Sequence, residues 1–100
     1  MAVDIVQTCR EHLERFFAGY DNPELRDRAL KAVRFLAAAE KAPAGNPAGW
    51  AAGIVYAMAN RYCIPCGVPG LLNAEFTAMM GVSMETVRTR AAQFNRIIEI

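Results

Sequence analysis

The sequence is poor in the side chains that most enzyme active sites use. It contains one histidine (His12), one serine (Ser83) and no glycine-rich phosphate-binding loop. Neither the serine nor any cysteine has a second histidine to act as its base, and no inward-facing carboxylate pair is evident for acid–base catalysis. We therefore do not expect an enzyme, and no small-molecule substrate is indicated.

Net charge and long apolar runs are also lacking. The formal net charge is +1, which excludes the overall electrostatic signature of a strongly basic nucleic-acid binder. No apolar run approaches the roughly 20 residues that cross a bilayer, and the first residues mix charged with apolar side chains, unlike a secretion signal. We expect a cytoplasmic protein without a membrane partner. Its 3 cysteines are then reduced thiols or metal ligands rather than a disulfide framework.

The composition is that of a folded domain. The chain has 100 residues, of which 54% are hydrophobic and 21% charged, and this length suits one domain over residues 1–100. Apolar residues recur at helical spacing and no segment reads as a strand. The pattern predicts a compact all-α domain of five helices. They cover about residues 3–18, a segment starting at residue 23, and residues 47–62, 74–80 and 84–98.

Two Asn-Pro pairs and one unusual helix organise this prediction. Asn22 and Asn46 each precede a proline, an arrangement that caps a helix and starts it with proline at its first position. The helix over 47–62 has no charged side chain from residue 48 to residue 59 and is rich in alanine and glycine, which predicts a central helix buried on all sides. Six aromatic residues are expected in the core: Phe16, Phe17, Phe35, Trp50, Tyr56 and Phe94.

Residues 73–98 read as a helix-turn-helix formed by the last two helices. Asn73 is placed to cap the first of these helices, and Gly81 allows the left-handed backbone of a short turn. Val82 fills the angle between the helices, and Ser83 caps the second one. Val87 then packs the last helix on the core, so the opposite face points outward.

The outward residues of the last helix are candidates for reading DNA in the major groove. Our first hypothesis is a DNA-associated regulatory module in which an arginine of this helix contacts phosphates or bases. A single domain of near-neutral charge binds DNA weakly, so this function needs a dimer or a partner. The candidate DNA-binding residues are Glu85, Arg88, Thr89, Arg90 and Arg96.

The alternative hypothesis is a protein-interaction module that uses a groove between helices and binds no nucleic acid. The connector before residue 73 is unusually apolar for a loop, and an exposed apolar patch marks an interaction surface. A homodimer through this patch fits either hypothesis. The candidate patch residues are Ile64, Val68, Leu71 and Leu72.

Three short segments carry a resemblance to a known architecture. They are residues 9–13 (CREHL), residues 49–56 (GWAAGIVY) and residues 81–83 (GVS). Five helices with a small-residue third helix before a helix-turn-helix resemble a cyclin box, in particular the repeat of transcription factor IIB, whose helix-turn-helix is matched here by residues 76–90. The order of the three segments also resembles a bacterial family of domains of unknown function. The resemblance covers nearly the whole chain and implies the cyclin-box fold. Cyclin boxes bind DNA in some proteins and other proteins elsewhere, so both hypotheses remain open.

Cysteine and histidine form the other chemical pattern. Cys63 and Cys66 have the C-x-x-C-G spacing of a metal knuckle, and Cys9 and His12 lie three residues apart on one predicted helix. Together they supply three sulfurs and one imidazole, the ligand set of a structural zinc site without an open catalytic position. In the other interpretation Cys9 belongs to the apolar stripe and no metal or other cofactor is bound. A redox C-x-x-C is not expected, because its usual strand context is absent.

Overall fold

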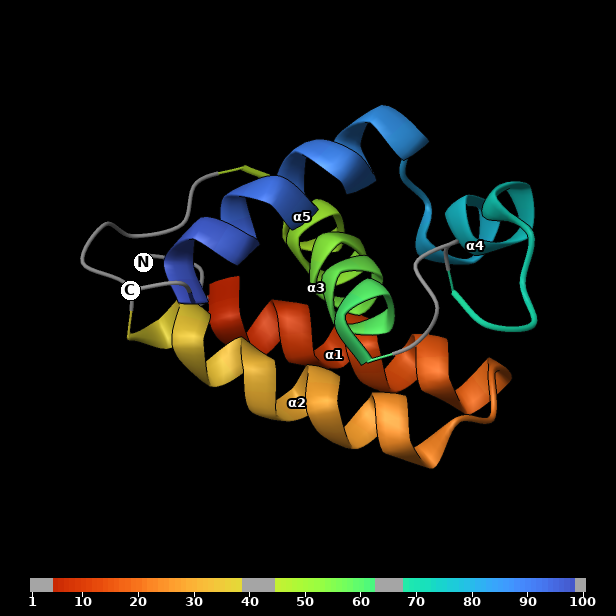
Figure 1. The fold of residues 1–100 in the computed structure, drawn as a ribbon, viewed down its shortest axis with the longest axis horizontal. Coiled ribbons are helices and arrows are strands. Elements are labelled where there is room, and N and C mark those ends of the chain that lie inside the picture. Colours follow the sequence, from red (N-terminus) through yellow and green to blue (C-terminus); the bar gives the residue numbers. More distant parts are fainter. Residues whose placement is uncertain (1–4, 39–44, 63–67, 99–100) are drawn as a thin grey trace.

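The computed structural model describes residues 5–38, 45–62 and 68–98, which form five α-helices and no strand (Figure 1). The all-α prediction is confirmed, and the helix ends agree with the predicted ones within the usual uncertainty of helix boundaries. The helices are α1 (Ile5–Gly19), α2 (Pro23–Ala37), α3 (Pro47–Tyr62), α4 (Asn73–Met80) and α5 (Met84–Ile98).

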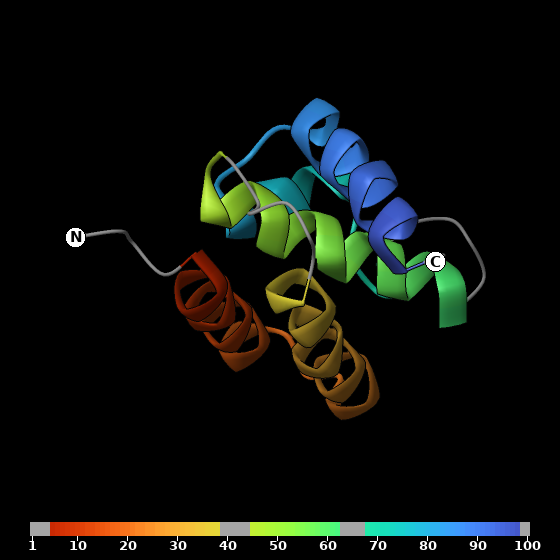
Figure 2. The ribbon, with the colours of Figure 1, turned by 90° about the vertical axis from the view of Figure 1, so that its left-hand side faces the viewer.

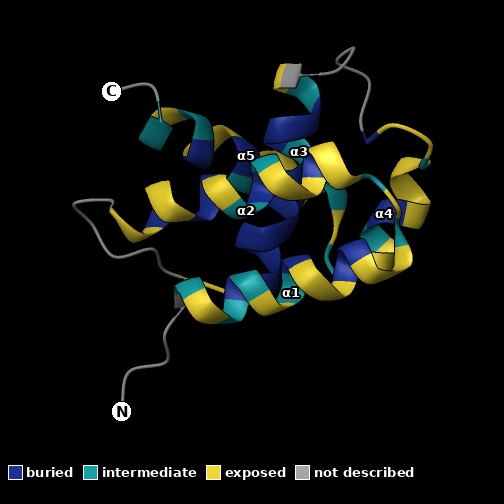
Figure 3. Ribbon diagram, turned by 90° about the horizontal axis from the view of Figure 1, so that it is seen from below, coloured by how far each residue is buried: buried dark blue, intermediate teal, exposed yellow. Residues whose placement is uncertain are grey.

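Helix α3 is the centre of the fold. Helices α1 and α2 form an antiparallel pair on one side of it, α5 lies on the opposite side, and α4 is at one end (Figures 1 and 2). α3 packs against each of the other helices. Between residues 48 and 59 every side chain is buried except that of Tyr56, which is half-buried (Figure 3). The prediction of a central, uncharged helix is therefore confirmed, because a helix covered on all sides has no position for a solvated charge.

The contact between α3 and α5 is close because glycine occupies α3 where the helices meet. A Cβ atom built on Gly53 would stand 2.6 Å from the Cβ of Arg90 and 2.9 Å from the backbone nitrogen of Ala91. One turn earlier, a Cβ on Gly49 would stand 3.0 Å from the Cγ2 methyl of Thr86. The small residues predicted to admit a close neighbour thus do so against α5.

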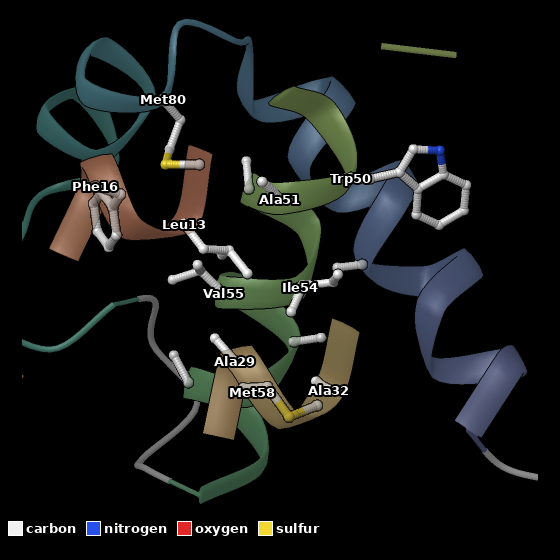
Figure 4. Close-up of a cluster of buried hydrophobic side chains, with 14 of the residues drawn as sticks. Leu13, Phe16, Ala29, Ala32, Trp50, Ala51, Ile54, Val55, Met58 and Met80 are labelled. Carbon is white, nitrogen blue, oxygen red and sulfur yellow. The ribbon is translucent and has the colours of Figure 1, made fainter. Parts of the chain in front are cut away.

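The core is built from side chains of all five helices, and Figure 4 shows part of it around α3. Phe76 anchors α4, since its ring is 1% exposed and meets that of Phe16 edge to face at a centroid distance of 5.4 Å. One core prediction is wrong: Phe35 is 54% exposed. The buried stripe of α2 includes Ala32 and Leu36, and Phe35 falls on the flank of that stripe, where none of the described helices covers it.

Both predicted asparagine caps are confirmed. The Oδ1 atom of Asn22 accepts a hydrogen bond from the backbone N–H of Leu25 at 3.1 Å, and that of Asn46 accepts one from the N–H of Ala48 at 3.0 Å. Each bond satisfies an N–H group that has no partner within its helix. These local signals set the starts of α2 and α3.

The predicted cap at Asn73 is wrong by one residue. Asn73 is the first residue of α4, and Leu72 precedes it in the capping position. The backbone N–H of Leu72 donates to the Oε1 atom of Glu75 at 2.9 Å, and the N–H of Phe76 donates to the carbonyl of Leu72 at 3.0 Å. A carboxylate in the first turn replaces the side-chain cap and also suits the positive end of the helix.

Candidate functional site

The turn between α4 and α5 has the predicted local structure. Gly81 adopts the left-handed conformation with φ of 72°, and its N–H donates to the carbonyl of Thr77 at 2.8 Å. Ser83 caps α5, since its Oγ atom accepts from the backbone N–H of Thr86 at 3.2 Å. Val82 is half-buried against the core. The turn therefore sets where α5 begins and directs its first turn.

The packing of α4 and α5 departs from a compact helix-turn-helix. In the described ranges α4 packs on α1 and α3, α5 packs on α3 and α2, and the two helices have little contact with each other. Thr77 stands where such motifs usually have alanine, and its hydroxyl donates to the carbonyl of Asn73 at 3.0 Å. α5 is thus held as a surface helix by the central helix α3 rather than by α4.

Four of the five candidate DNA-binding residues lie on the solvent face of α5. Arg88, Thr89 and Arg96 are exposed, as are Glu85 and the intervening Ala92. The opposite face supplies the buried residues Val87, Ala91 and Phe94. The predicted division into an inward stripe and an outward face is therefore confirmed. The outward face carries two arginines, one glutamate and small side chains between them.

The fifth candidate, Arg90, has a different environment. Its Cζ atom lies 4.7 Å from the centroid of the Trp50 ring, and its Nη1 atom donates to the Oε1 atom of Gln93 at 2.9 Å. Figure 4 shows the Trp50 indole on the side of α3 that faces α5. This cation–π contact holds α5 on α3. Arg90 is half-buried and also lines a shallow depression of about 300 Å³ together with Glu85 and Thr89.

The candidate zinc ligands Cys9 and His12 are turned to different surroundings. Cys9 is fully buried, and its thiol donates to the carbonyl oxygen of Pro47 at an Sγ–O distance of 3.2 Å. Burial raises the pKa of this thiol to about 12, because the core does not solvate the charged thiolate. His12 is half-buried beside Met79 and Gly81, in a depression of about 220 Å³.

The described residues contain no group of three or more histidine, cysteine, aspartate or glutamate side chains placed to hold a metal ion. Cys63 and Cys66 lie outside these residues. A structural zinc that uses them stays a prediction.

The predicted apolar patch on the connector is not continuous. Val68 is 3% exposed and belongs to the core, whereas Leu72 is 71% exposed. The Tyr20 hydroxyl donates to the carbonyl of Pro69, and the N–H of Leu71 donates to the carbonyl of Val68 at 3.1 Å. The first of these bonds ties Pro69 to Tyr20 near the end of α1, next to the buried Val68. Leu71 is half-buried, and Ile64 lies outside the described residues.

A groove opens between α2, α3 and α5, at a place that the sequence predictions did not specify. It has a volume of about 330 Å³ and includes Phe35, Met58 and Ile98 in its lining. Phe35, whose ring is exposed, is the sequence position that could have indicated this groove. From the sequence this phenylalanine was predicted to lie in the core, because it is next to the apolar stripe of α2.

The chain matches no known family model, and no curated protein or solved structure matches it. The resemblance to a cyclin box therefore stays a prediction based on short segments. No helix in the described part of the chain is both long and apolar enough to cross a membrane.

Proposed function

We propose that this protein is a non-enzymatic regulatory module that binds duplex DNA through the exposed face of α5. The observation that supports this most directly is that a surface helix, capped at Ser83 and packed firmly on α3, presents Arg88, Thr89 and Arg96 to solvent on one face. A helix presented in this way is the element that most small DNA-binding domains place in the major groove. The cyclin-box resemblance is consistent with this function, and a cyclin-like fold is part of the proposal.

The residue types on this face suit nucleic acid. Arg88 and Arg96 are eight residues apart, which corresponds to about 12 Å along an α-helix, so they contact different positions along a groove. Thr89 and Ala92 between them are small enough to let the helix approach base edges. Arginine pairs with guanine or phosphate, and a glutamate such as Glu85 accepts a hydrogen bond from the cytosine amino group.

The low net charge limits the affinity of a single copy. Each phosphate contact contributes a salt-dependence slope of about −0.9 in log K against log salt. Two arginines on α5 therefore correspond to a slope of about −2, which is shallower than the slopes of strong DNA binders. Stable binding needs a second copy or a partner protein.

The test is a fluorescence-anisotropy titration of mixed-sequence duplex DNA at several salt concentrations. The informative variant is Arg88→Gln with Arg96→Gln, because both side chains are exposed and Arg90 is left in place on Trp50. The matched control is Arg26→Gln with Arg34→Gln, which removes the same charge from the exposed face of α2.

We expect the α5 variant to lose affinity and about two units of salt slope, while the α2 control keeps most of both. Absence of binding by the wild type at the lowest salt would refute the proposal. Equal losses in the two variants would also refute it, because binding would then depend on net charge and not on α5.

A protein-interaction function is the second candidate, and the outer face of α4 favours it. Leu72 and Met79 are 71% and 42% exposed. Leu72 immediately precedes α4, and Met79 lies in its last turn. Large apolar side chains exposed at one helix suit contact with a second copy of the chain. Light scattering after size-exclusion chromatography tests this: we expect a dimer for the wild type and a monomer for Leu72→Ser with Met79→Ser. A monomeric wild type would contradict self-association.

A further inference from the structure

The groove between α2, α3 and α5 has an apolar floor made of core residues. Ala32, Met58 and Phe94 line it and are respectively 4%, 5% and 0% exposed. Phe35 and Ile98 add apolar surface at its sides, and Phe35 is 54% exposed. The exposed phenylalanine ring and this floor form apolar surface, and a bound molecule that shields it from water is stabilised by the hydrophobic effect.

The rim of this groove is basic. Lys31, Arg61 and Arg28 also line it, and no carboxylate does so among the described residues. The Nζ atom of Lys31 lies 3.0 Å from the carboxylate of Asp27, in a pair in which both side chains are about two-thirds exposed (68% and 65%). Such a surface pair is weak. Arg61 donates to the neutral Oδ1 atom of Asn95 at 3.4 Å, and no ion pair is formed with it by the residues that the structure describes.

The size of the groove decides between classes of ligand. Its volume of about 330 Å³ falls at the lower end of small-molecule sites, which measure about 300–1,000 Å³. A protein partner in a stable complex covers about 800 Å² on each side, far more than one such depression provides. An apolar floor with a cationic rim therefore suits a small molecule that is apolar at one end and negatively charged at the other.

We propose that this groove binds a small amphiphilic carboxylate, with an acyl chain or aromatic ring against Phe35 and Met58 and the carboxylate at the Lys31–Arg61 rim. The groove shares no residue with the α5 face assigned to DNA. The proposal is therefore independent of the DNA-binding function and fails or succeeds separately from it.

Three probes with the same alkyl chain test the wild-type protein by isothermal titration calorimetry: decanoate, decanol and decyltrimethylammonium, each kept below its micelle-forming concentration. Decanoate is expected to bind roughly tenfold more tightly than decanol, a difference of about 1.4 kcal/mol, because a hydrogen bond to a charged group is stronger than one to a neutral group. Decyltrimethylammonium is expected to bind more weakly than either. Equal affinity for decanoate and decanol, or no binding of decanoate, would overturn the proposal.

Two variants then locate the site. Lys31→Gln with Arg61→Gln is expected to lower decanoate affinity to the level of decanol, and Phe35→Ala is expected to weaken both probes. All three side chains are exposed, so the fold is retained, and a thermal melt checks this. The control Arg26→Gln with Arg34→Gln removes two exposed charges from α2 outside the groove. Decanoate binding that responds equally to the rim variant and to this control would place the ligand elsewhere and refute the assignment.

Discussion

Replacing Gly53 with alanine tests whether the close contact between α3 and α5 stabilises the protein. A Cβ atom at this position would stand 2.6 Å from the Cβ of Arg90 and 2.9 Å from the nitrogen of Ala91. Real Cβ atoms do not approach other atoms so closely, and one of these neighbours is the backbone of α5. Relief of the clash therefore requires α5 to move away from α3, together with the residues packed between them.

Two opposing terms set the expected magnitude. Alanine is a better helix former than glycine by about 1 kcal/mol, which favours the variant. Overpacking a close-packed contact costs about 1–3 kcal/mol, and the upper end applies where backbone rather than a flexible side chain must move. We expect Gly53→Ala to lower the free energy of unfolding by about 1–2 kcal/mol, which corresponds to a fall in Tm of roughly 5–15 °C for a domain of this size.

Thermal and urea denaturation followed by circular dichroism measure this change. Gly19→Ala is the matched control, because a Cβ there would meet only the Cε methyl of Met79 at 3.4 Å, an ordinary contact with a flexible side chain. We expect the control to stay within about 0.5 kcal/mol of the wild type. Gly49→Ala should fall between them, since the Thr86 methyl 3.0 Å away is able to shift. A Gly53→Ala protein as stable as the wild type would show that the two helices are not held in this contact.

Two further expectations concern the core. Phe76→Ala should cost about 3–5 kcal/mol in urea denaturation, because it removes a buried ring that anchors α4; a loss similar to the small one expected for the exposed Phe35→Ala would contradict the packing described. The second expectation concerns pH: the unfolded Cys9 thiol ionises near its ordinary value of 9.0, but burial raises the folded pKa to about 12. Between these values the unfolded state binds fewer protons, so stability should fall by about 1.4 kcal/mol per pH unit. The measurement is urea denaturation from about pH 8 to about pH 11, with chelator, in a Cys63→Ser, Cys66→Ser background. A Cys9→Ala variant with the same pH slope as its parent would exclude Cys9 as the cause.

The local elements were predictable because their signals lie within a few residues. Asn22 and Asn46 precede prolines and cap the helices that follow, and Gly81 with Ser83 produces the turn before α5. The central position of α3 was also predictable, since a helix that is apolar on all sides is stable only when it is buried on all sides. These are consequences of backbone hydrogen bonding and of desolvation, which act on the sequence directly.

The candidate site was only partly predictable, because neighbours far along the chain decide what covers each side chain. Arg90 carries a charge that favours contact with solvent or DNA, yet it lies over Trp50, forty residues earlier. Val68 reads as loop surface but is buried once Tyr20 binds the connector. Phe35 was predicted to be in the core, but no helix in the described part of the chain covers its side of α2.

The sequence by itself determined that the described residues form five helices, where α2, α3 and α5 begin, that α3 is the interior helix, and which face of α5 points outward. Caps, turns and apolar periodicity depend on residues within one or two helical turns of each other, so they can be recognised in the sequence without knowledge of the fold. Only the tertiary structure decided that α5 rests on the glycines of α3 rather than on α4, that Arg90 is tied to Trp50, and that a basic-rimmed groove opens beside Phe35. Those features depend on how three helices cross, and the crossing is set by the shape of the whole packed core.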